Sequence, residues 1–452
     1  MAWSMLNPGC NPSQHEEVLM VSRSFRNLAL LITSAAAVGA GLLACGSGED
    51  SQPSAKGGNV AKSELARDTN PNVSEANLRT LTLDNATFGI DLLRSVRTGQ
   101  SNVFLSPHSI SSALVMTYAG AEGNTKAQMA QALRFTLPDS ELHAAFNRLD
   151  LDLQARGNTG NEKSFRLNLA NAIWALADYP WKQPFLDVLA LNYGAGINLL
   201  PSFVGAEDTI NAWVGDQTNQ MIPTLLPPGT LTSETRMALV NAVYFRGSWA
   251  DPFEMESTSD GVFQGVNGDV TVPMMRKRTN DRYLAGTGYQ AIRLPYEGEG
   301  VAMTIVLSEQ GREEEVRNAL DPSLFNDIAQ QNTAEVILTM PKFKFTWGTE
   351  SLKDALTKAG MTDAFAGPAN FTGMADTPEQ LFIKDVLHQA VVAVDEDGTE
   401  AAGATTVIVD ADAGAPPIVP PVEMKVDRPF FFGIHDATTG ALLFLGEVVD
   451  PS

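Results

Sequence analysis

Small residues fill the stretch Glu396-Asp397-Gly398-Thr399-Glu400-Ala401-Ala402-Gly403-Ala404-Thr405-Thr406, which lies between two runs rich in valine and isoleucine. Residues 391–394 before it have the pattern of a buried strand, and residues 407–409 follow it. A segment of this kind can be a flexible exposed loop. It can also enter a crowded sheet, because no large side chain obstructs it. A segment that does both at different times would have this composition.

Composition limits the possible classes of protein. The chain has 452 residues, of which 44% are hydrophobic, so it can bury a sizeable core in one large domain or in two or three smaller ones. Its net charge of −22 argues against a nucleic-acid partner, since phosphates require a basic face. The charge favours solubility and does not identify a partner.

The N-terminus predicts an export signal. Arg23 and Arg26 precede an apolar run over residues 28–43, which ends in Leu42-Leu43-Ala44-Cys45. This ending resembles a bacterial lipobox, in which Cys45 is lipidated and becomes the mature N-terminus. Residues 1–44 are therefore predicted to be a leader, with Met20 as an alternative start. A single membrane anchor or ordinary signal cleavage is the alternative, although the run is short for a spanning helix.

The predicted processing of the N-terminus also decides whether a disulfide can form. Cys10 would be removed with the leader and Cys45 would carry lipid, so no disulfide is expected. Gly46 after the cysteine resembles the outer-membrane sorting pattern, which predicts an exported protein on the outer membrane or cell surface. Residues 45–76 are rich in polar and small residues and are predicted to form a flexible tether.

From residue 77 to the C-terminus the composition is globular and no linker divides it. Helices come mainly first and strands mainly later, which favours an α+β fold. Helical patterns occur at residues 81–96, 109–119, 125–133, 183–191, 206–220 and 352–359. Strand patterns occur at residues 238–245, 301–307, 335–338, 391–394, 430–434 and 442–448.

Sequence patterns of catalysis are missing. The chain has no Gly-x-Ser-x-Gly elbow, no His-Glu-x-x-His helix and no Walker loop. No metal site and no cofactor are predicted. A Ser-His-Asp arrangement can be dispersed along a sequence, so it remains an alternative.

Two polar residues interrupt apolar strands. His388 precedes the strand over residues 390–394, where it is either a general base or a core histidine bonded to polar neighbours. Asn241 lies inside Leu239-Val240-Asn241-Ala242-Val243. A buried amide is costly unless it is paired, so a polar network is expected, with Ser106 and Ser109 as candidate partners. Trp249 is either a binding aromatic or a core residue.

Several motifs, in order along the chain, together resemble the serpin family over residues 81–449. Two of them are Asn102-Val103-Phe104-Leu105-Ser106-Pro107-His108-Ser109-Ile110 and Asn241-Ala242-Val243-Tyr244-Phe245-Arg246-Gly247-Ser248-Trp249. The others are Gly120-Ala121-Glu122-Gly123-Asn124-Thr125, Ile210-Asn211-Ala212-Trp213-Val214, Met340-Pro341-Lys342-Phe343 and Asp427-Arg428-Pro429-Phe430, completed by the stretch from Glu396 to Ala404.

The resemblance implies a single domain over residues 77–452 with three β-sheets, one of them a large central sheet, and about eight or nine helices. It also implies an exposed reactive-centre loop over residues 396–422. In this family the loop is bait for a protease, which cuts it and forms an acyl-enzyme. The cut loop then enters the central sheet as a new strand and traps the protease. The chain would then be an inhibitor, a monomer, and not an enzyme.

The family's hinge maps onto residues 396–404, and these residues agree with an inhibitory protein. Glu396, Gly398 and Thr399 match the inhibitory pattern, and Glu400 continues it. The residues that follow are small, namely Ala401, Ala402, Gly403 and Ala404. No proline interrupts the segment before Pro416, so every backbone donor is available for pairing.

The family also implies roles for the polar residues noted above. Ser106, Ser109, Asn241 and His388 correspond to the shutter, where the strands of the central sheet part. Trp249 corresponds to the breach, at the end of the sheet where the loop enters. These residues would control conformation rather than catalyse a reaction.

The position of the scissile bond is open. Counting about 16 residues from Glu396, as in the family, reaches Asp412-Ala413, whereas counting back from Glu423 reaches Ile418-Val419. We favour the first count, because the hinge side must fill the sheet. Val409, Asp410 and Ala411 are alternatives to Asp412 and Ala413.

These candidates imply different target proteases. A small apolar residue suits an elastase- or subtilisin-like enzyme, and an aspartate suits an Asp-preferring one. No lysine or arginine lies between Gly398 and Lys425, which argues against a trypsin-like target. The alternative function is a non-inhibitory serpin that acts as a binding or structural protein at the cell surface.

Overall fold

The structure is a computed structural model that describes residues 59–157, 165–298, 300–377, 380–399 and 420–452. All of these residues belong to one compact unit, Asp50–Ser452. Several predicted site residues lie outside the described ranges: Cys45, Glu400, Ala401, Ala402, Gly403, Ala404, Val409, Asp410, Ala411, Asp412 and Ala413.

One sheet has seven strands, which run side by side in the order β1-β4-β3-β5-β13-β12-β11. Their bounds are β1 (Asn59–Ala61), β4 (Ile197–Leu200), β3 (Arg166–Leu176), β5 (Met237–Ser248), β13 (Gly398–Thr399), β12 (Val386–Val394) and β11 (Phe343–Ser351). The central strands β5 and β12 are parallel and pair directly over residues 239–243 and 386–390. Beyond that pairing, β13 lies between them.

The other strands connect as one nine-stranded sheet, with β6 paired to β7 beside the path β14-β10-β7-β8-β9-β15-β16-β2. Their bounds are β14 (Val422–Lys425), β10 (Thr333–Pro341), β6 (Ser259–Gly265), β7 (Gly268–Gly286), β8 (Tyr289–Pro295), β9 (Val301–Ser308), β15 (Phe430–Asp436), β16 (Leu442–Val448) and β2 (Val103–Leu105). Three sheets were expected. Two are traced because β7 is long enough to pair with β6 at one end, with β10 along its middle and with β8 at the other end.

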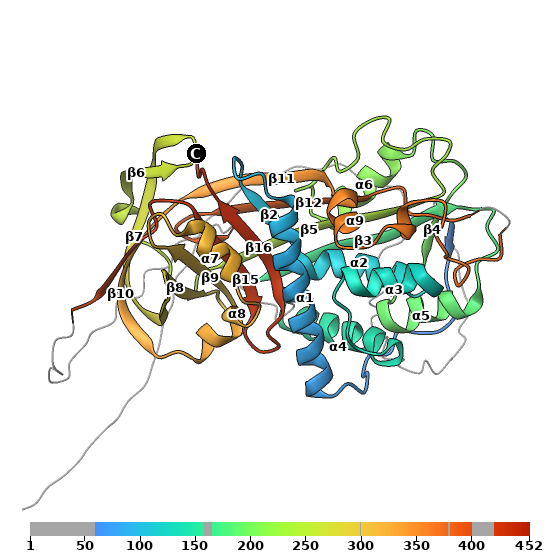
Figure 1. Ribbon diagram of the computed structural model, residues 1–452, viewed down its shortest axis with the longest axis horizontal. Coiled ribbons are helices and arrows are strands. Elements are labelled where there is room, and N and C mark those ends of the chain that lie inside the picture. The colour runs from blue at the N-terminus through green and yellow to red at the C-terminus, as the bar shows by residue number, and fades with distance from the viewer. Residues whose placement is uncertain (1–58, 158–164, 299, 378–379, 400–419) are drawn as a thin grey trace, which may run out of the picture. The chain divides into compact units, whose positions relative to one another are not determined.

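The described residues contain nine α-helices, in agreement with the predicted α+β class. They are α1 (Glu75–Val96), α2 (Pro107–Tyr118), α3 (Gly123–Ala132), α4 (Asp139–Gly157), α5 (Gln183–Tyr193), α6 (Glu207–Gln217), α7 (Glu313–Ala319), α8 (Leu324–Asp327) and α9 (Lys353–Lys358). Figure 1 shows α6 on one side of the seven-stranded sheet and α2 to α5 on the other. Sequence patterns predicted no helix at α4, although its buried residues Leu142, Phe146, Leu149 and Leu153 have helical spacing, and predicted no strand at β3.

The two faces of the seven-stranded sheet contact different apolar clusters. Ala170, Val240 and Ala242 pack with Trp213 of α6. Leu239, Val243 and Phe245, which alternate with them along β5, belong to the main core on the opposite face. Since successive side chains of a strand point to opposite faces, each residue of β3 and β5 can be assigned to the α6 face or the core face.

The predicted tether over residues 45–76 is wrong for its second half. β1 pairs with β4 and forms the edge of the seven-stranded sheet, with Val60 opposite Asn198. Ser63 then donates a 2.5 Å hydrogen bond to Asp187 of α5, and Arg67 donates to Asp150 of α4 at 2.5 Å. Specific polar side chains therefore hold a segment whose composition suggested flexibility. In the described ranges, no helix is long and apolar enough to cross a membrane.

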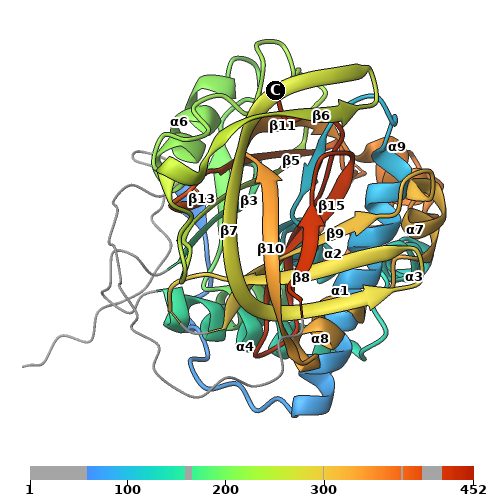
Figure 2. The same ribbon diagram turned by 90° about the vertical axis from the view of Figure 1, so that its left-hand side faces the viewer.

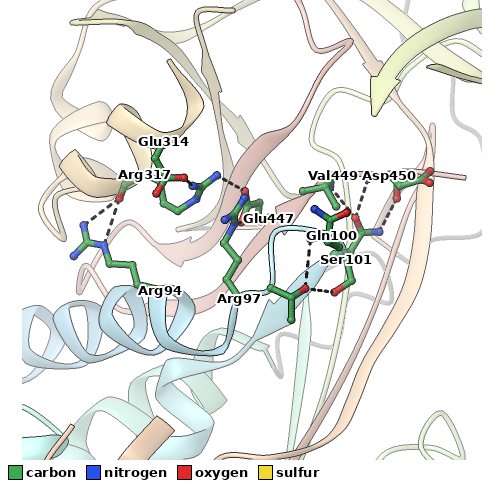
Figure 3. Close-up of polar contacts among 11 residues, drawn as sticks. Arg94, Arg97, Gln100, Ser101, Glu314, Arg317, Glu447, Val449 and Asp450 are labelled. Atoms are coloured by element: carbon green, nitrogen blue, oxygen red, sulfur yellow. Dashed lines mark hydrogen bonds and ion pairs between the residues drawn. The ribbon is translucent and has the colours of Figure 1, made fainter. Parts of the chain in front are cut away.

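A polar cluster holds the C-terminal strand β16 against α1 and α7. Glu447 is only 1% exposed and pairs with Arg97 at 2.5 Å and with Arg317 at 2.9 Å. Figure 3 shows these side chains converging from three elements, together with Arg94, whose guanidinium caps the end of α7 by donating to the carbonyl of Arg317. A buried carboxylate with two cationic partners is satisfied, so this cluster is a structural tie.

Candidate functional site

The first residues of the predicted hinge lie inside the seven-stranded sheet. Gly398 is opposite Ser248 of β5, and Thr399 is opposite Gly247 on that side and Val394 of β12 on the other. Figure 2 labels this short strand, β13, which lies between the central strands β5 and β12. The hinge therefore already separates β5 from β12 at one end, while the two strands still pair at the other end.

Glu396 anchors the hinge to two neighbouring segments. Its carboxylate accepts a 2.6 Å hydrogen bond from the Lys342 ammonium and a 2.8 Å hydrogen bond from the Thr258 hydroxyl. Burial raises the pKa of Glu396, but these two hydrogen bonds outweigh it and hold the pKa below its usual value. Glu396 is therefore charged at neutral pH and holds the hinge next to the start of β11.

Trp249, at the predicted breach, contacts the hinge with its backbone and its ring. Its backbone N–H donates to the carbonyl of Asp397 at 2.8 Å, and its indole N–H donates to the carbonyl of Asp395 at 3.0 Å. The ring stacks on Tyr296 with centroids 4.6 Å apart. The Tyr296 hydroxyl in turn shares a 2.7 Å hydrogen bond with the Thr399 hydroxyl. Trp249 and Tyr296 thus bind both ends of the segment 395–399.

The predicted shutter residues form one hydrogen-bonded network, as the polar interruptions of the strands indicated. His388 Nδ1 is bonded to Asn241 Oδ1, and His388 Nε2 accepts from the backbone N–H of Ser106 at 3.2 Å. The Asn241 amide donates to Ser109 Oγ at 2.6 Å and to Asn171 Oδ1 at 2.6 Å. Three strands and α2 are therefore joined at the point where β5 and β12 meet.

The chemistry of His388 favours a structural role. The side chain is fully buried, and burial lowers its pKa to about 3, so the ring is neutral at physiological pH. A neutral ring that accepts at Nε2 carries its proton on Nδ1, which donates to the Asn241 carbonyl oxygen. Ser106 Oγ donates to the carbonyl of Leu443 rather than to this ring. His388 is therefore not placed to activate a serine.

Three contributing residues were not singled out from the sequence. Asn171 completes the shutter, and the only signal for it was a polar residue inside an apolar run. Lys342 belongs to the motif Met340-Pro341-Lys342-Phe343, but the sequence assigned it no role. Its partner Glu396 is 54 residues away along the chain. Tyr296 had no signal, because its partner Thr399 is 103 residues away.

Comparison with known proteins identifies similar chains. A sequence profile described as serpin (serine protease inhibitor) matches residues 83–451. The chain is 34% identical over 368 residues to a serpin-like protein of Thermococcus kodakarensis, covering 80% of this chain and 84% of the relative. It is 34% identical over 387 residues to the leukocyte elastase inhibitor of Bos taurus, covering 82% of this chain and 99% of that one.

Solved structures agree with these sequence matches. The native state of tengpin, a thermophilic serpin, superposes with a TM-score of 0.76 at 29% identity, covering 86% of this chain and 99% of tengpin. Human thyroxine-binding globulin, solved in complex with its ligand, gives a TM-score of 0.72 at 28% identity, with 83% and 100% covered.

Proposed function

Since this chain belongs to the serpin family, whose members include serine protease inhibitors, we propose that it is a suicide inhibitor of serine proteases. The protease serine attacks the carbonyl carbon of the residue before the scissile bond, the new amine leaves, and an ester joins protease and inhibitor. The loop on the hinge side then enters the seven-stranded sheet. Trapping requires that insertion is faster than hydrolysis of the ester by water.

The position of β13 is the observation that carries this proposal. Its two residues already pair with β5 and β12 in the antiparallel direction that an inserted strand requires. If the same register continues, residues 398–409 would lie along the whole of β5, from Ser248 to Met237. Val409 would then be the last residue beside β5, which supports a scissile bond at or beyond it, between Val409 and Ala413.

The same register explains why the inserting residues are small. Ala402 and Ala404 would face α6, opposite Tyr244 and Ala242, where Ala170 and Ala172 already pack closely with that helix. Ala401 and Gly403, which alternate with these two residues, would face the main core. Large side chains at these positions would require α6 or the core to move, which slows insertion.

The shutter would have to open during insertion. If the pairing of β13 with β5 and with β12 continued along the inserting loop, Thr405 would lie between Asn241 and His388. These two side chains are bonded to each other in the intact protein. The threonine hydroxyl can both donate and accept, so it would replace the contact that insertion breaks.

The target and location follow from the loop and the N-terminus. We favour Asp412-Ala413 as the bond, with Val409, Asp410 and Ala411 as alternatives, and an elastase- or subtilisin-like target, with an Asp-preferring protease as the alternative. Similarity to leukocyte elastase inhibitors supports an elastase-like target. Lipidation at Cys45 would hold the monomeric inhibitor at the outer membrane or cell surface.

A panel of proteases tests the function. The full chain is incubated with elastase-like, subtilisin-like, trypsin-like and Asp-preferring enzymes, and covalent complexes are sought on denaturing gels. The proposal expects an SDS-stable complex with at least one of the elastase-like, subtilisin-like and Asp-preferring enzymes. Mass spectrometry of the released peptide then identifies the bond that was cut. Cleavage without a complex, and without a rise in thermal stability, would indicate the non-inhibitory alternative.

A further inference from the structure

A short segment after α6 lies on the face of the seven-stranded sheet that α6 covers. Residues 222–226, here called the strap, follow α6 in the chain and are neither helical nor extended. Leu225, near the end of the strap, is fully buried. It belongs to one apolar cluster with Val240 of β5 and Val391 of β12. The strap is therefore part of the layer that covers both central strands.

One hydrogen bond joins the strap to β11, which lies beyond β12. The Thr349 hydroxyl donates to the backbone carbonyl of Leu225 at 2.8 Å. Thr349 lies in an irregularity of β11 that faces Gln389 of β12, and bulges of this kind redirect side chains. Gln389 is in turn paired with Ala242 of β5. At this level β5 and β12 are direct neighbours, so the strap reaches β11 across a closed part of the sheet.

Three hydrogen bonds join the strap to α6. The side-chain oxygen of Asn211 accepts from the backbone N–H groups of Leu225 and Leu226 at 2.9 and 2.8 Å. The amide nitrogen of Asn211 donates to the carbonyl of Leu226 at 2.8 Å. One side chain of α6 thus fixes the backbone that carries the acceptor for Thr349.

Helix α6 is in turn attached to β3, on the other side of β5. The Asn168 amide of β3 donates to the carbonyl of Gln217, the last residue of α6, at 3.2 Å. The rings of Trp174 and Trp213 meet edge to face with centroids 6.0 Å apart. A continuous connection therefore runs from β3 through α6 and the strap to β11, over the seam between β5 and β12.

A strand added between β5 and β12 would stretch this connection. Neighbouring strands lie about 4.8 Å apart, so β11 and β12 would move away from β3 and β5 by about that distance. A hydrogen bond is lost when donor and acceptor are about 3.6 Å apart, so at least one link must open. The weakest link is the bond from Thr349, since it is the only hydrogen bond between strap and β11 in the described part of the chain.

We infer that the hydrogen bond between Thr349 and Leu225 is a clasp that opens when the loop enters the sheet, so that Thr349 sets the rate of insertion. This inference rests on the proposed function and assigns the rate of its insertion step to residues distant from the scissile bond. Thr349 is a positioning residue, which acts through the strap. The clasp stabilises the intact form only, so it would hold the sheet closed until the loop is cut.

The substitution Thr349→Val tests the clasp, because it removes the hydroxyl and keeps the shape of the side chain. A protease that cuts the loop without being trapped is added in large excess, and tryptophan fluorescence then follows insertion. Insertion is expected to be about fivefold faster than in wild type, which is the effect of one neutral hydrogen bond. The thermal midpoint of the intact form should fall by about 1 °C, while that of the cleaved form stays unchanged.

Two further variants serve as controls. Thr349→Ser keeps the hydroxyl and should insert at the wild-type rate. Thr346→Val is the matched control, because Thr346 is an exposed threonine of the same strand, opposite Val391, and makes no hydrogen bond to the strap. It should change neither the rate nor the two midpoints.

Two results would overturn the inference and leave the proposed function in place. One is a wild-type insertion rate in Thr349→Val, and the other is an equal loss of midpoint in its intact and cleaved forms, as expected for a merely structural contact. If the wild-type protein gains no thermal stability on cleavage, insertion itself does not occur. That result would remove the proposed function and the clasp together, so the two failures are distinguishable.

Discussion

Tyr296 and Thr399 share a hydrogen bond between their hydroxyl groups, 2.7 Å long and buried, at the point where the hinge enters the sheet. Tyr296 also stacks on Trp249, whose indole and backbone N–H groups hold two hinge carbonyls. One aromatic pair therefore contacts both ends of the segment 395–399. In the intact protein, Gly398 and Thr399 at the start of the loop are already paired within the sheet.

Tyr296→Phe is expected to weaken this hold. The substitution removes the hydroxyl and leaves Thr399 Oγ1 without its partner, at a cost of about 1 kcal/mol. Limited proteolysis should then cut the hinge faster than in wild type. Tyr283→Phe is the control, since Tyr283 is a half-buried tyrosine of β7 that makes no hydrogen bond to the described part of the hinge. Equal proteolysis of all three proteins would contradict the role of Tyr296.

Gly398→Ala is expected to displace the hinge from the sheet. Gly398 has φ +153°, and a Cβ there would be 2.2 Å from the Gly247 carbonyl oxygen. Because backbone atoms cannot move aside as a flexible side chain can, β13 must leave its position. Intrinsic fluorescence should change, since Trp249 loses its hinge contacts, and more inhibitor should be needed per protease trapped.

Gly367→Ala is the matched control for that experiment, because a Cβ at Gly367 meets nothing within 4 Å. It should behave as wild type in both measurements. An unchanged fluorescence spectrum for Gly398→Ala would show that β13 is not held by the close backbone approach at this position.

His388→Ala is expected to destabilise the closed shutter. The substitution leaves the buried Asn241 carbonyl oxygen and the Ser106 backbone N–H without their partner, which costs about 1–3 kcal/mol for each buried group left unsatisfied. On mild heating, native gels should show polymers, or a monomer with an inserted loop and no inhibitory activity. A variant that stays monomeric and active would remove His388 from the control of sheet opening.

Thr405→Val is expected to leave the intact protein unchanged and to lower the thermal midpoint of the cleaved form. If the register of residues 398–399 continues after insertion, Thr405 would lie between Asn241 and His388, where valine could not replace their broken hydrogen bond. Thr406→Val is the control, because residue 406 would face α6 rather than the shutter. Similar midpoints for the two cleaved variants would contradict the predicted register.

Acid is expected to unfold the protein through its buried histidines. Burial lowers the pKa of His388 and His435 to about 3 and of His143 to about 4. In the unfolded chain these groups titrate near 6.5, so the unfolded state binds more protons below that pH. Stability is therefore fully present above pH 6.5 and falls toward pH 3, by about 2 kcal/mol per histidine at pH 5. Urea unfolding at pH 7 and pH 5 measures the difference, which His388→Gln should reduce.

Local patterns in the sequence predicted helices and strands such as α2 and β5, and the polar residues that interrupt strands predicted the hydrogen-bonded network of Asn241 and His388. The hinge and shutter roles stay predictions. Local patterns could not predict Lys342, Tyr296 or Asn171 as partners, because each contact joins segments that meet only in the folded chain. The composition of residues 59–74 suggested a tether, whereas a few side chains, such as Arg67, attach this segment to the domain. Composition describes the average tendency of a segment and does not detect such single contacts.

The pairing of β1 with β4 has a consequence for contacts between copies of the chain. A sheet that must accept one extra strand is at risk of accepting a strand from a neighbour, and its exposed edges are the first places for such pairing. β1 covers residues 197–199 of β4 and is itself the edge strand, only three residues long. Because a short edge strand offers few free backbone groups, the N-terminal segment limits pairing with another chain at this edge.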